Sequence, residues 1–258
     1  MTPALLALDF DGVICNGLRE YFQTARKAYC EVWQPTHPQP PVELADLFYR
    51  LRPVVESGWE MPLLLRALML GESEQVILQS WSTISQKLLQ TEHLTSQVLT
   101  RAVDGVRDRW IAADLAGWLA EHAFYPGVIE RLQQILDQGT PVWIISTKEG
   151  RFIQQLLLQQ GLRLQGLTIL GKEVKRPKHQ TLRELAASYP DPPDIWFVED
   201  RFKTLLRVQQ QPDLPFVTLF LADWGYNTAA ERVAAQHHPG IQLISLTQFA
   251  ADFPIWTG

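Results

Sequence analysis

The chain has 258 residues, of which 46 % are hydrophobic and 20 % are charged, a composition typical of globular proteins rather than disordered ones. Its 23 basic and 28 acidic residues leave a formal net charge of −5, so no basic surface favours nucleic acid, and we expect none as a partner. Two cysteines are too few for a disulfide framework, and no apolar run is long enough to cross a membrane. We therefore expect a soluble, cytoplasmic protein with one large domain or two small ones.

Six short apolar runs predict buried strands, one near the N-terminus and five after a long interruption. They are 5–8, 142–146, 167–170, 195–198, 216–221 and 241–245. From the second run onward each is followed by a helical pattern, with turn residues such as Gly139 and Gly161 between elements. This alternation predicts an α/β domain with a parallel sheet. Ligands of such sheets bind at the carboxyl ends of the strands.

The interruption, about residues 18–124, contains no convincing strand and several amphipathic helical patterns. We expect helices over 18–33, 42–51, 62–70, 74–90 and 96–119. Pro62 suits a first helical position, and Ser73 and Thr95 suit N-caps. The simplest interpretation is a helical domain inserted after the first strand. Five of the nine tryptophans fall in this insert, and we expect most of them to build its own small core: Trp33, Trp59, Trp81, Trp110 and Trp118.

Two carboxylates follow the first apolar run. In ALLALDFDGVICNG, Asp9 and Asp11 stand at its end, with Gly12 behind them. Residues i and i+2 of an extended chain project the same way, and two close carboxylates repel each other unless a cation lies between them. Hard oxygen ligands of this kind suit Mg²⁺. For this motif taken alone, the alternative is a strand that simply ends in solvated aspartates.

Three further motifs stand at the ends of later runs. PVWIISTKEG offers Ser146, VKRPKHQTLREL carries basic residues into a predicted helix, and WFVED ends in Glu199 and Asp200. Together with DFDGV, these motifs resemble, in this order, those of the haloacid dehalogenase-like superfamily. AFYPGVIERLQQILDQG also resembles the family's return from an inserted cap to the core. The resemblance implies an α/β fold: a Rossmann-like three-layer parallel-sheet core of residues 1–17 and 125–258, and an all-helical cap of residues 18–124 inserted after the first strand.

The resemblance also implies roles for the matching residues. Asp9 is expected to be the nucleophile that becomes an aspartyl phosphate, and Asp11 the general acid and base. An acidic residue at position 11 is a feature of the family's phosphatases and phosphomutases, and its dehalogenases lack it. Ser146, with Thr147 beside it, is expected to bind the phosphoryl group. The expected Mg²⁺ ligands are Asp9, Asp11, Asp200 and Glu199.

The third and fourth motifs depart from the family's pattern. In the third, alignment on a Lys-Pro pattern puts Arg176 in the place of the family's lysine, whereas alignment on the following helix puts Lys178 there. We prefer Lys178, because a compact ammonium at a helix start suits an oxygen shared between phosphate and nucleophile. In the fourth, position 204 is Thr204 where the family often has a second Asp. Glu199 is therefore expected either to bind the metal or to lie close behind Asp200.

A cluster of polar and aromatic residues lies around Gly58 in the insert segment LRPVVESGWEMPLLL. Its members are Arg52, Glu56, Trp59 and Glu60. They either pack and cap a helix end, or form a loop that closes over a substrate. Trp59 is the tryptophan that we expect to face substrate.

For two other segments we prefer a structural interpretation. Lys148 and Arg151 follow Ser146 and either contact substrate or, as we prefer, lie in an exposed first helical turn. ADWGYNT, at 222–228, looks like a turn into a helix, with Asn227 or Thr228 as its cap.

These observations predict a Mg²⁺-dependent phosphomonoester hydrolase that acts through an aspartyl phosphate on a small, polar phosphorylated metabolite. One alternative is a phosphomutase of the same family, which uses the same residues but returns the phosphoryl group to another hydroxyl. Another is a non-catalytic binding module that uses the aromatic faces of the insert. The sequence carries no readable signal for substrate identity or oligomeric state.

Overall fold

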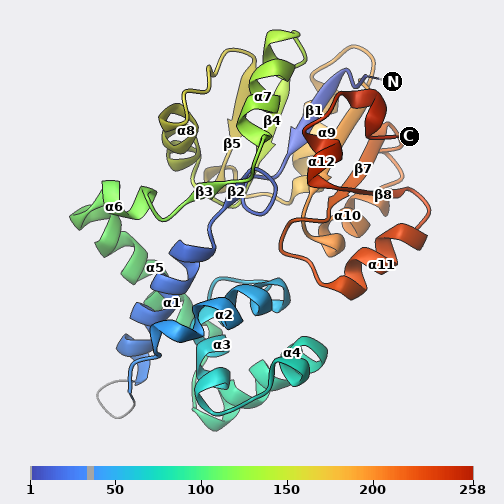
Figure 1. Cartoon of the computed structure of the whole chain (residues 1–258). Coiled ribbons are helices and arrows are strands. Elements are labelled where there is room, and N and C mark those ends of the chain that lie inside the picture. Colours follow the sequence, from blue (N-terminus) through green and yellow to red (C-terminus); the bar gives the residue numbers. More distant parts are fainter. Residues whose placement is uncertain (1, 34–37, 258) are drawn as a thin grey trace. The chain divides into compact units, whose positions relative to one another are not determined.

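The computed structural model describes residues 2–33 and 38–257. The chain divides into two compact units, shown in Figure 1. Unit 1 is Met1–Asn16 together with Ala123–Gly258, and unit 2 is Gly17–His122. Unit 1 is therefore discontinuous in sequence, with unit 2 inserted after Asn16.

Unit 1 is built on one parallel sheet. Its strands are β1 (Leu5–Leu8), β4 (Val142–Ile145), β5 (Leu167–Leu170), β6 (Ile195–Glu199), β7 (Val217–Ala222) and β8 (Ile241–Ile244), in the order β5-β4-β1-β6-β7-β8. All five neighbouring pairs are parallel. The central strands β1 and β6 are buried along their whole length, as expected for a sheet covered on both faces. The structure thus confirms the predicted α/β parallel-sheet fold.

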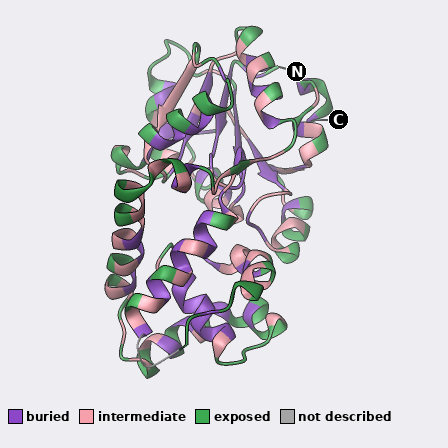
Figure 2. Cartoon of the chain, turned by 60° about the vertical axis from the view of Figure 1, so that its left-hand side comes forward, coloured by how far each residue is buried: buried purple, intermediate pink, exposed green. Residues whose placement is uncertain are grey.

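Helices cover both faces of this sheet. They are α7 (Val128–Asp137), α8 (Gly150–Gln159), α9 (Lys178–Ala187), α10 (Phe202–Gln209), α11 (Ala229–His237) and α12 (Leu246–Phe249), with short 3₁₀ turns at Lys172–Val174 and Phe253–Ile255. On one face, α9, α10 and α11 contribute Leu182, Leu205 and Ala235 to a core shared with the strands. In Figure 2 the central strands of unit 1 have the buried colour, the edge strand β5 has the intermediate colour, and the helices beside the sheet expose their outer sides.

The C-terminal segment forms an aromatic layer on the sheet. The rings of Trp196 on β6 and Phe220 on β7 are 5.1 Å apart, and both contact Trp256 at 5.7 Å. Trp256 also stacks on Phe249 of α12 at 4.9 Å. Aromatic rings bury large apolar areas in such contacts, so Trp196 and Trp256 stabilise this layer, and Trp224 adjoins it 5.5 Å from Phe249.

The strand register brings the predicted motifs to one edge of the sheet. Leu8 of β1 is paired with Ile144 of β4 and with Val198 of β6. The residue after Leu8, which is Asp9, therefore lies level with the last residues of both neighbouring strands. Ser146 and Asp200 follow directly after those ends. Because all strands run the same way, these side chains meet at the carboxyl edge, where ligands of parallel sheets bind.

Unit 2 is helical. Its helices are α1 (Leu18–Trp33), α2 (Ala45–Leu51), α3 (Glu60–Met69), α4 (Glu74–Thr91), α5 (Ser96–Ala113) and α6 (Leu115–Leu119), with 3₁₀ turns at Val42–Leu44 and Arg52–Val54. Helix α1 packs against α3 and α5. The side chains of Ser73 and Thr95 accept hydrogen bonds from the N–H groups of Val76 and Val98, which confirms both as N-caps.

Three expectations about the insert are wrong in detail. Pro62 is the third residue of α3, which begins at Glu60, and not its first residue as expected. A proline is tolerated there because the N–H groups of the first helical turn have no partner within the helix. The helix expected over 96–119 breaks at Asp114, which is extended and caps α6 through the N–H of Gly117. A two-residue strand, β3 (Ala123–Phe124), pairs antiparallel with β2 (Cys15–Asn16); strands this short leave no alternating pattern in a sequence.

Buried charges in unit 2 are paired, and tryptophans take part in the pairing. Glu20, which is fully buried, accepts from Arg107 at 2.8 Å and from Trp118 Nε1 at 3.1 Å. Likewise Glu92 accepts from Arg66 at 2.8 Å and from Trp33 Nε1 at 3.0 Å. A tryptophan supplies both apolar area and one N–H donor. Trp33, Trp81 and Trp118 are buried in unit 2, whereas Trp59 and Trp110 are half-buried.

Within residues 2–33 and 38–257, no helix has the length and apolar character needed to cross a membrane.

Candidate functional site

A lysine whose side chain is only 14 % exposed joins two acidic residues at the carboxyl edge of the sheet. Nζ of Lys178, the first residue of α9, lies 2.8 Å from Asp9 Oδ1 and 2.6 Å from Glu199 Oε2. The other oxygen of Glu199 accepts from the main-chain N–H groups of Asp200 and Arg201. Glu199 is fully buried, and its two oxygens are both engaged by the protein. It therefore holds the ammonium of Lys178 beside Asp9.

Asp9, Glu199 and Asp200 form a cluster of carboxylates. One oxygen of each lies within 4.8 Å of the others, and all three residues are buried. Gly12 lies directly against this cluster: its φ is +90°, and a Cβ there would be 2.1 Å from Asp200 Oδ2. Only glycine fits at this position, because any side chain would meet the carboxylate and strain the backbone.

Burial raises the pKa values of all three acids. It raises the pKa of Asp9 to about 7, although Lys178 lowers it and Glu199 raises it further. It raises the pKa of Glu199 to about 7 in the same way, with Lys178 opposing and Asp200 adding to the rise. The pKa of Asp200 is raised by burial and by Asp9. Burial alone would lower the pKa of Lys178, but Asp9 and Glu199 outweigh it and hold that pKa above its usual range.

The donor set fits a divalent cation. Three carboxylates against one ammonium leave two negative charges in a buried site when all groups are ionised. Burial of two uncompensated negative charges destabilises the folded protein unless a carboxylate is protonated or a cation binds. The oxygens of Asp9 and Asp200 are hard ligands of the type that Mg²⁺ takes, with few protein carboxylates and the rest of its shell from water and phosphate.

Asp11 lies beside this cluster but outside it. The cluster contains Asp9, Glu199 and Asp200, whereas Asp11 Oδ1 is 3.4 Å from Lys148 Nζ. The side chain of Lys148 is only 9 % exposed, so the expectation of an exposed turn at this lysine is wrong. The main-chain N–H of Lys148 also donates to Oγ of the buried Ser146 at 3.2 Å. Ser146, Lys148 and Asp11 therefore form one group at the ends of β4 and β1.

In the part of the chain that the structure describes, the other two residues expected at the phosphate site, Arg176 and Thr147, form no hydrogen bond or ion pair with Asp9, Glu199 or Asp200. The guanidinium of Arg176 donates to Thr181 Oγ1 at 3.1 Å and pairs with Glu184 on α9. The side chain of Arg176 is thus engaged along the helix, while Lys178 contacts Asp9. Thr147 is exposed. Of the two alignments considered for the third motif, the geometry favours Lys178.

The turn between β7 and α11, for which no chemistry was expected, contacts the site directly. The N–H of Tyr226 donates to Asp200 Oδ2 at 2.8 Å, and Asn227 Nδ2 donates to the main-chain oxygen of Asp200 at 3.0 Å. Nε1 of Trp224 donates to the main-chain oxygen of Val13 at 3.1 Å. Thr228 caps α11 with Glu231 in a capping box. A main-chain contact from a distant loop leaves no motif in a sequence, which is why this segment was missed.

Two of the four predicted residues of unit 2, Glu60 and Arg52, have local partners of their own. Glu60 is buried and its carboxylate accepts from the N–H groups of Glu56 and Ser57, at 2.6 and 2.7 Å. Arg52 donates to the main-chain oxygen of Val55 at 2.9 Å, and its guanidinium lies 4.9 Å from the ring centre of Tyr21. Trp59 is half-buried and Glu56 is exposed. Glu60 therefore holds the loop ahead of α3 in shape.

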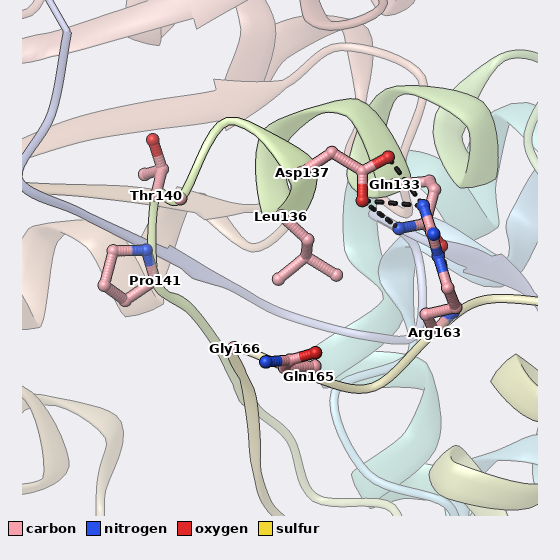
Figure 3. Close-up of a pocket in the computed structure, with 9 residues that line it drawn as sticks. Gln133, Leu136, Asp137, Thr140, Pro141, Arg163, Gln165 and Gly166 are labelled. Carbon is pink, nitrogen blue, oxygen red and sulfur yellow. Dashed lines mark hydrogen bonds and ion pairs between the residues drawn. The ribbon is translucent and has the colours of Figure 1, made fainter.

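A separate pocket of about 420 Å³ lies at the other edge of the sheet. It is lined by residues that precede β4 and β5 and by the end of α7, as Figure 3 shows. Arg163 reaches across it to both oxygens of Asp137 at 2.7 Å, an exposed pair of little energetic value. Because Asp9, Ser146 and Asp200 follow the carboxyl ends of parallel strands, this pocket is remote from them.

The chain is similar to a known family and to several solved structures. A family model described as haloacid dehalogenase-like hydrolase matches residues 3–205. A predicted phosphatase from Clostridium acetobutylicum is 15 % identical, with a TM-score of 0.58 over 97 % of each chain. A predicted phosphoglycolate phosphatase from Haemophilus somnus is 17 % identical, with a TM-score of 0.58 over 88 % of each chain.

The structural similarity extends to proteins with different described activities. Protein Tyrosine Kinase A of Mycobacterium tuberculosis is 17 % identical, with a TM-score of 0.57 over 98 % of this chain and 96 % of that one. No curated protein matches the chain. At these identities the solved structures establish the fold, and the chemistry has to be argued from the site.

Proposed function

The chain belongs to the haloacid dehalogenase-like hydrolase family, and on that basis we propose that it is a Mg²⁺-dependent phosphomonoester hydrolase that acts through an aspartyl phosphate. The observation that carries the proposal is the contact of Lys178 with both Asp9 and Glu199 beside Asp200. In this arrangement the ammonium of Lys178 contacts both Asp9 and Glu199, and Asp200 lies in the same cluster. A carboxylate oxygen of Asp9 held in this way is suited to attack the electron-poor phosphorus of a phosphate ester, whose own oxygens are negatively charged.

Asp9 is the proposed nucleophile. Its N–H donates to Val198 O at 2.9 Å, and Phe10 N donates to Asp9 Oδ1 at 2.7 Å, so the carboxylate leaves the sheet edge in one orientation. One of its oxygens forms a bond to phosphorus while the bond from phosphorus to the alcohol oxygen breaks. Water then attacks the aspartyl phosphate and releases inorganic phosphate. Such covalent catalysis splits one difficult step into two easier ones.

Lys178 and Ser146 bind and orient the phosphoryl group. The ammonium of Lys178 is charged throughout the neutral range, because its pKa is held above the usual value. It offsets negative charge on Asp9 and on the phosphoryl oxygens as they approach. Ser146 offers a hydroxyl from the end of β4. Mg²⁺, held by Asp9 and Asp200 when bound, would neutralise the phosphate and align it with the nucleophile.

Asp11 is the proposed general acid for the leaving alcohol and then the base for water. Lys148 Nζ, at 3.4 Å, keeps the carboxyl of Asp11 turned toward the end of β4. Asp11 gives a proton to the alcohol oxygen in the first step and takes a proton from the attacking water in the second step. Lys148 is therefore a positioning residue for Asp11, and it acts without contacting phosphorus.

The substrate is proposed to be a small, polar phosphate ester in the cytoplasm, with unit 2 acting as the cap. Within the segment expected to meet substrate, Glu60 shapes the loop, which leaves Arg52, Glu56 and Trp59 as the residues proposed to contact it. The alternatives are a phosphomutase and a non-catalytic module. The complete set of Asp9, Ser146, Lys178 and the acidic pair favours an enzyme over a binding module.

The test is hydrolysis of an aryl phosphate and of a panel of small phosphate esters, with Mg²⁺ and with a chelator. We expect Mg²⁺-dependent release of phosphate that Asp9→Asn abolishes. The matched control is Asp137→Asn, because that carboxylate is 52 % exposed and lies at the far edge of the sheet. Mass spectrometry of acid-quenched protein should show one added phosphoryl group on the peptide that contains Asp9.

Three outcomes would contradict parts of the proposal. No turnover of any ester, with or without metal, excludes the phosphatase. Turnover that needs a bisphosphate and returns the phosphoryl group to a second hydroxyl identifies a phosphomutase. Full activity of Asp9→Asn removes that residue from the chemistry.

A further inference from the structure

The loop between β7 and α11 holds Asp200 at two atoms. The main-chain N–H of Tyr226 donates to Asp200 Oδ2 at 2.8 Å. The side-chain amide of Asn227 donates to the main-chain oxygen of Asp200 at 3.0 Å. One short loop therefore constrains both the carboxylate and the backbone of a single acidic residue at the end of β6.

Asn227 is itself held in a single orientation. It is 2 % exposed, and its Nδ2 also donates to the main-chain oxygen of Ala222 at 2.7 Å. Arg232 on α11 donates to Asn227 Oδ1 at 3.1 Å and to its main-chain oxygen at 2.9 Å. The amide thus ties the end of β7 to the end of β6. A buried amide engaged in this way cannot rotate without leaving polar groups unsatisfied.

The loop is also in close contact with the backbone around Asp200. A Cβ on Gly225 would lie 2.3 Å from Asp200 Cβ and 2.6 Å from the main-chain oxygen of Gly12. The segments that follow β1, β6 and β7 therefore touch without space for a side chain. A movement of the loop would move Asp200 as well.

We propose that Asn227 is a positioning residue for the metal site, which sets the affinity for Mg²⁺ by fixing the direction of the Asp200 carboxylate. This inference rests on the proposed function, in which Asp200 is a metal ligand. A ligand atom of Asp200 already lies within 4.8 Å of those of Asp9 and Glu199. A carboxylate that is held in place before the cation arrives loses little rotational freedom on binding it, and removal of such support typically weakens metal binding about 10–100-fold.

The experiment is calorimetric titration of MgCl₂ into the metal-free full-length protein, without substrate. Asn227→Ala is expected to raise the Kd for Mg²⁺ by about tenfold or more. At saturating Mg²⁺, the KM for an aryl phosphate should remain that of the wild type, because Asn227 contacts neither phosphate nor the alcohol. Arg232→Met, at a half-buried position, should raise the same Kd by a smaller factor, since it frees the amide without removing it.

The matched control is Leu132→Ala on α7, which leaves a cavity in the core of the same unit. Within the described part of the chain, α7 forms no hydrogen bond with Asp200. It should lower the unfolding temperature and leave the Kd for Mg²⁺ unchanged. If Leu132→Ala weakens Mg²⁺ binding as much as Asn227→Ala does, the effect is one of general stability and the inference is wrong.

Asp200→Asn separates this inference from the proposed function. If that variant binds Mg²⁺ as tightly as the wild type, the metal site itself is wrong. If it abolishes binding while Asn227→Ala and Arg232→Met bind normally, the metal site stands and the positioning role of Asn227 is refuted. If Asn227→Ala does not fold, Arg232→Met decides: an unchanged Kd overturns the inference and a raised Kd supports it.

Discussion

Replacement of Lys178 by methionine tests the electrostatic balance at the centre of the site. Methionine keeps most of the volume and apolar length of the lysine but removes its charge. The ammonium of Lys178 is the group that contacts both Asp9 Oδ1 and Glu199 Oε2. Removal of one partner from a buried ion pair leaves an uncompensated charge and typically costs about 3–5 kcal/mol of unfolding free energy. We expect a loss of this size at pH 8 in the absence of metal.

The unfolding free energy that Lys178→Met loses should be larger at pH 8 than at pH 5.5. The pKa values of Asp9 and Glu199 are near 7 in the folded protein, against 3.8 and 4.5 for the free groups. From about pH 4 to pH 7 the folded protein keeps protons that the unfolded chain has released, so its free energy of unfolding falls as pH rises. Loss of the ammonium raises both pKa values further, so Lys178→Met should go on losing stability above pH 7. At pH 5.5 both carboxyls are largely protonated, and the loss should be smaller.

The measurement is native-state hydrogen exchange on peptides of β1 and β6, in chelator at pH 5.5 and pH 8. Exchange resolved by peptide reports the opening of unit 1 apart from that of unit 2. The control is Lys172→Met, an exposed lysine in the same unit, for which we expect a change within about 0.5 kcal/mol. A loss below about 1 kcal/mol at pH 8, or one that is equal at the two pH values, would refute the reasoning, because it would mean that Asp9 and Glu199 do not need the ammonium.

Three further predictions follow from the same contacts. Mg²⁺ should raise the unfolding temperature more at pH 8 than at pH 5.5, because protons and the cation compete for the site carboxylates, whose pKa values are raised. Thermal scans in which Mg²⁺ raises the unfolding temperature equally at both pH values would contradict this prediction. Gly12→Ala should abolish phosphatase activity and destabilise unit 1 by about 1–3 kcal/mol, since its Cβ meets Asp200 at a φ of +90°; wild-type turnover would disprove the close approach. Arg107→Met should destabilise unit 2 by about 3–5 kcal/mol, because it leaves the fully buried Glu20 without its cation. Arg19→Met, at a side chain that is 64 % exposed, should change the stability by less than about 1 kcal/mol in the same hydrogen-exchange measurement.

The strands were predictable because a buried parallel strand has a local signature. All six apolar runs form strands of the sheet, and their ends differ from the expected ends by at most one residue. The helices of unit 2 were predictable where caps and apolar stripes agree, as at Ser73 and Thr95. The break at Asp114 was missed because the apolar pattern continues across it, although the chain is extended there.

The contacts around the carboxylates depended on residues that are far apart in the sequence. Lys148 looks like part of an exposed turn until the end of β1 is placed beside the end of β4, which brings its Nζ to Asp11. Asn227 looks like a helix cap until β7 is placed beside β6, which brings its amide to Asp200. No local pattern records either contact, because each depends on the order of strands in the sheet.

The amino-acid sequence by itself determined which residues are proposed to carry the chemistry: Asp9 and Asp11 after one strand, Ser146 after another, and the acidic pair after a third. Local rules suffice there, since an apolar run that ends in polar residues predicts where a strand ends. Only the tertiary structure decided how these residues act on one another. It shows that Lys178 contacts Asp9, that Glu199 holds Lys178, and that the loop after β7 contacts Asp200. The physical reason is that charge, burial and hydrogen bonding depend on distances in space, and the strand order, which no local pattern encodes, sets those distances.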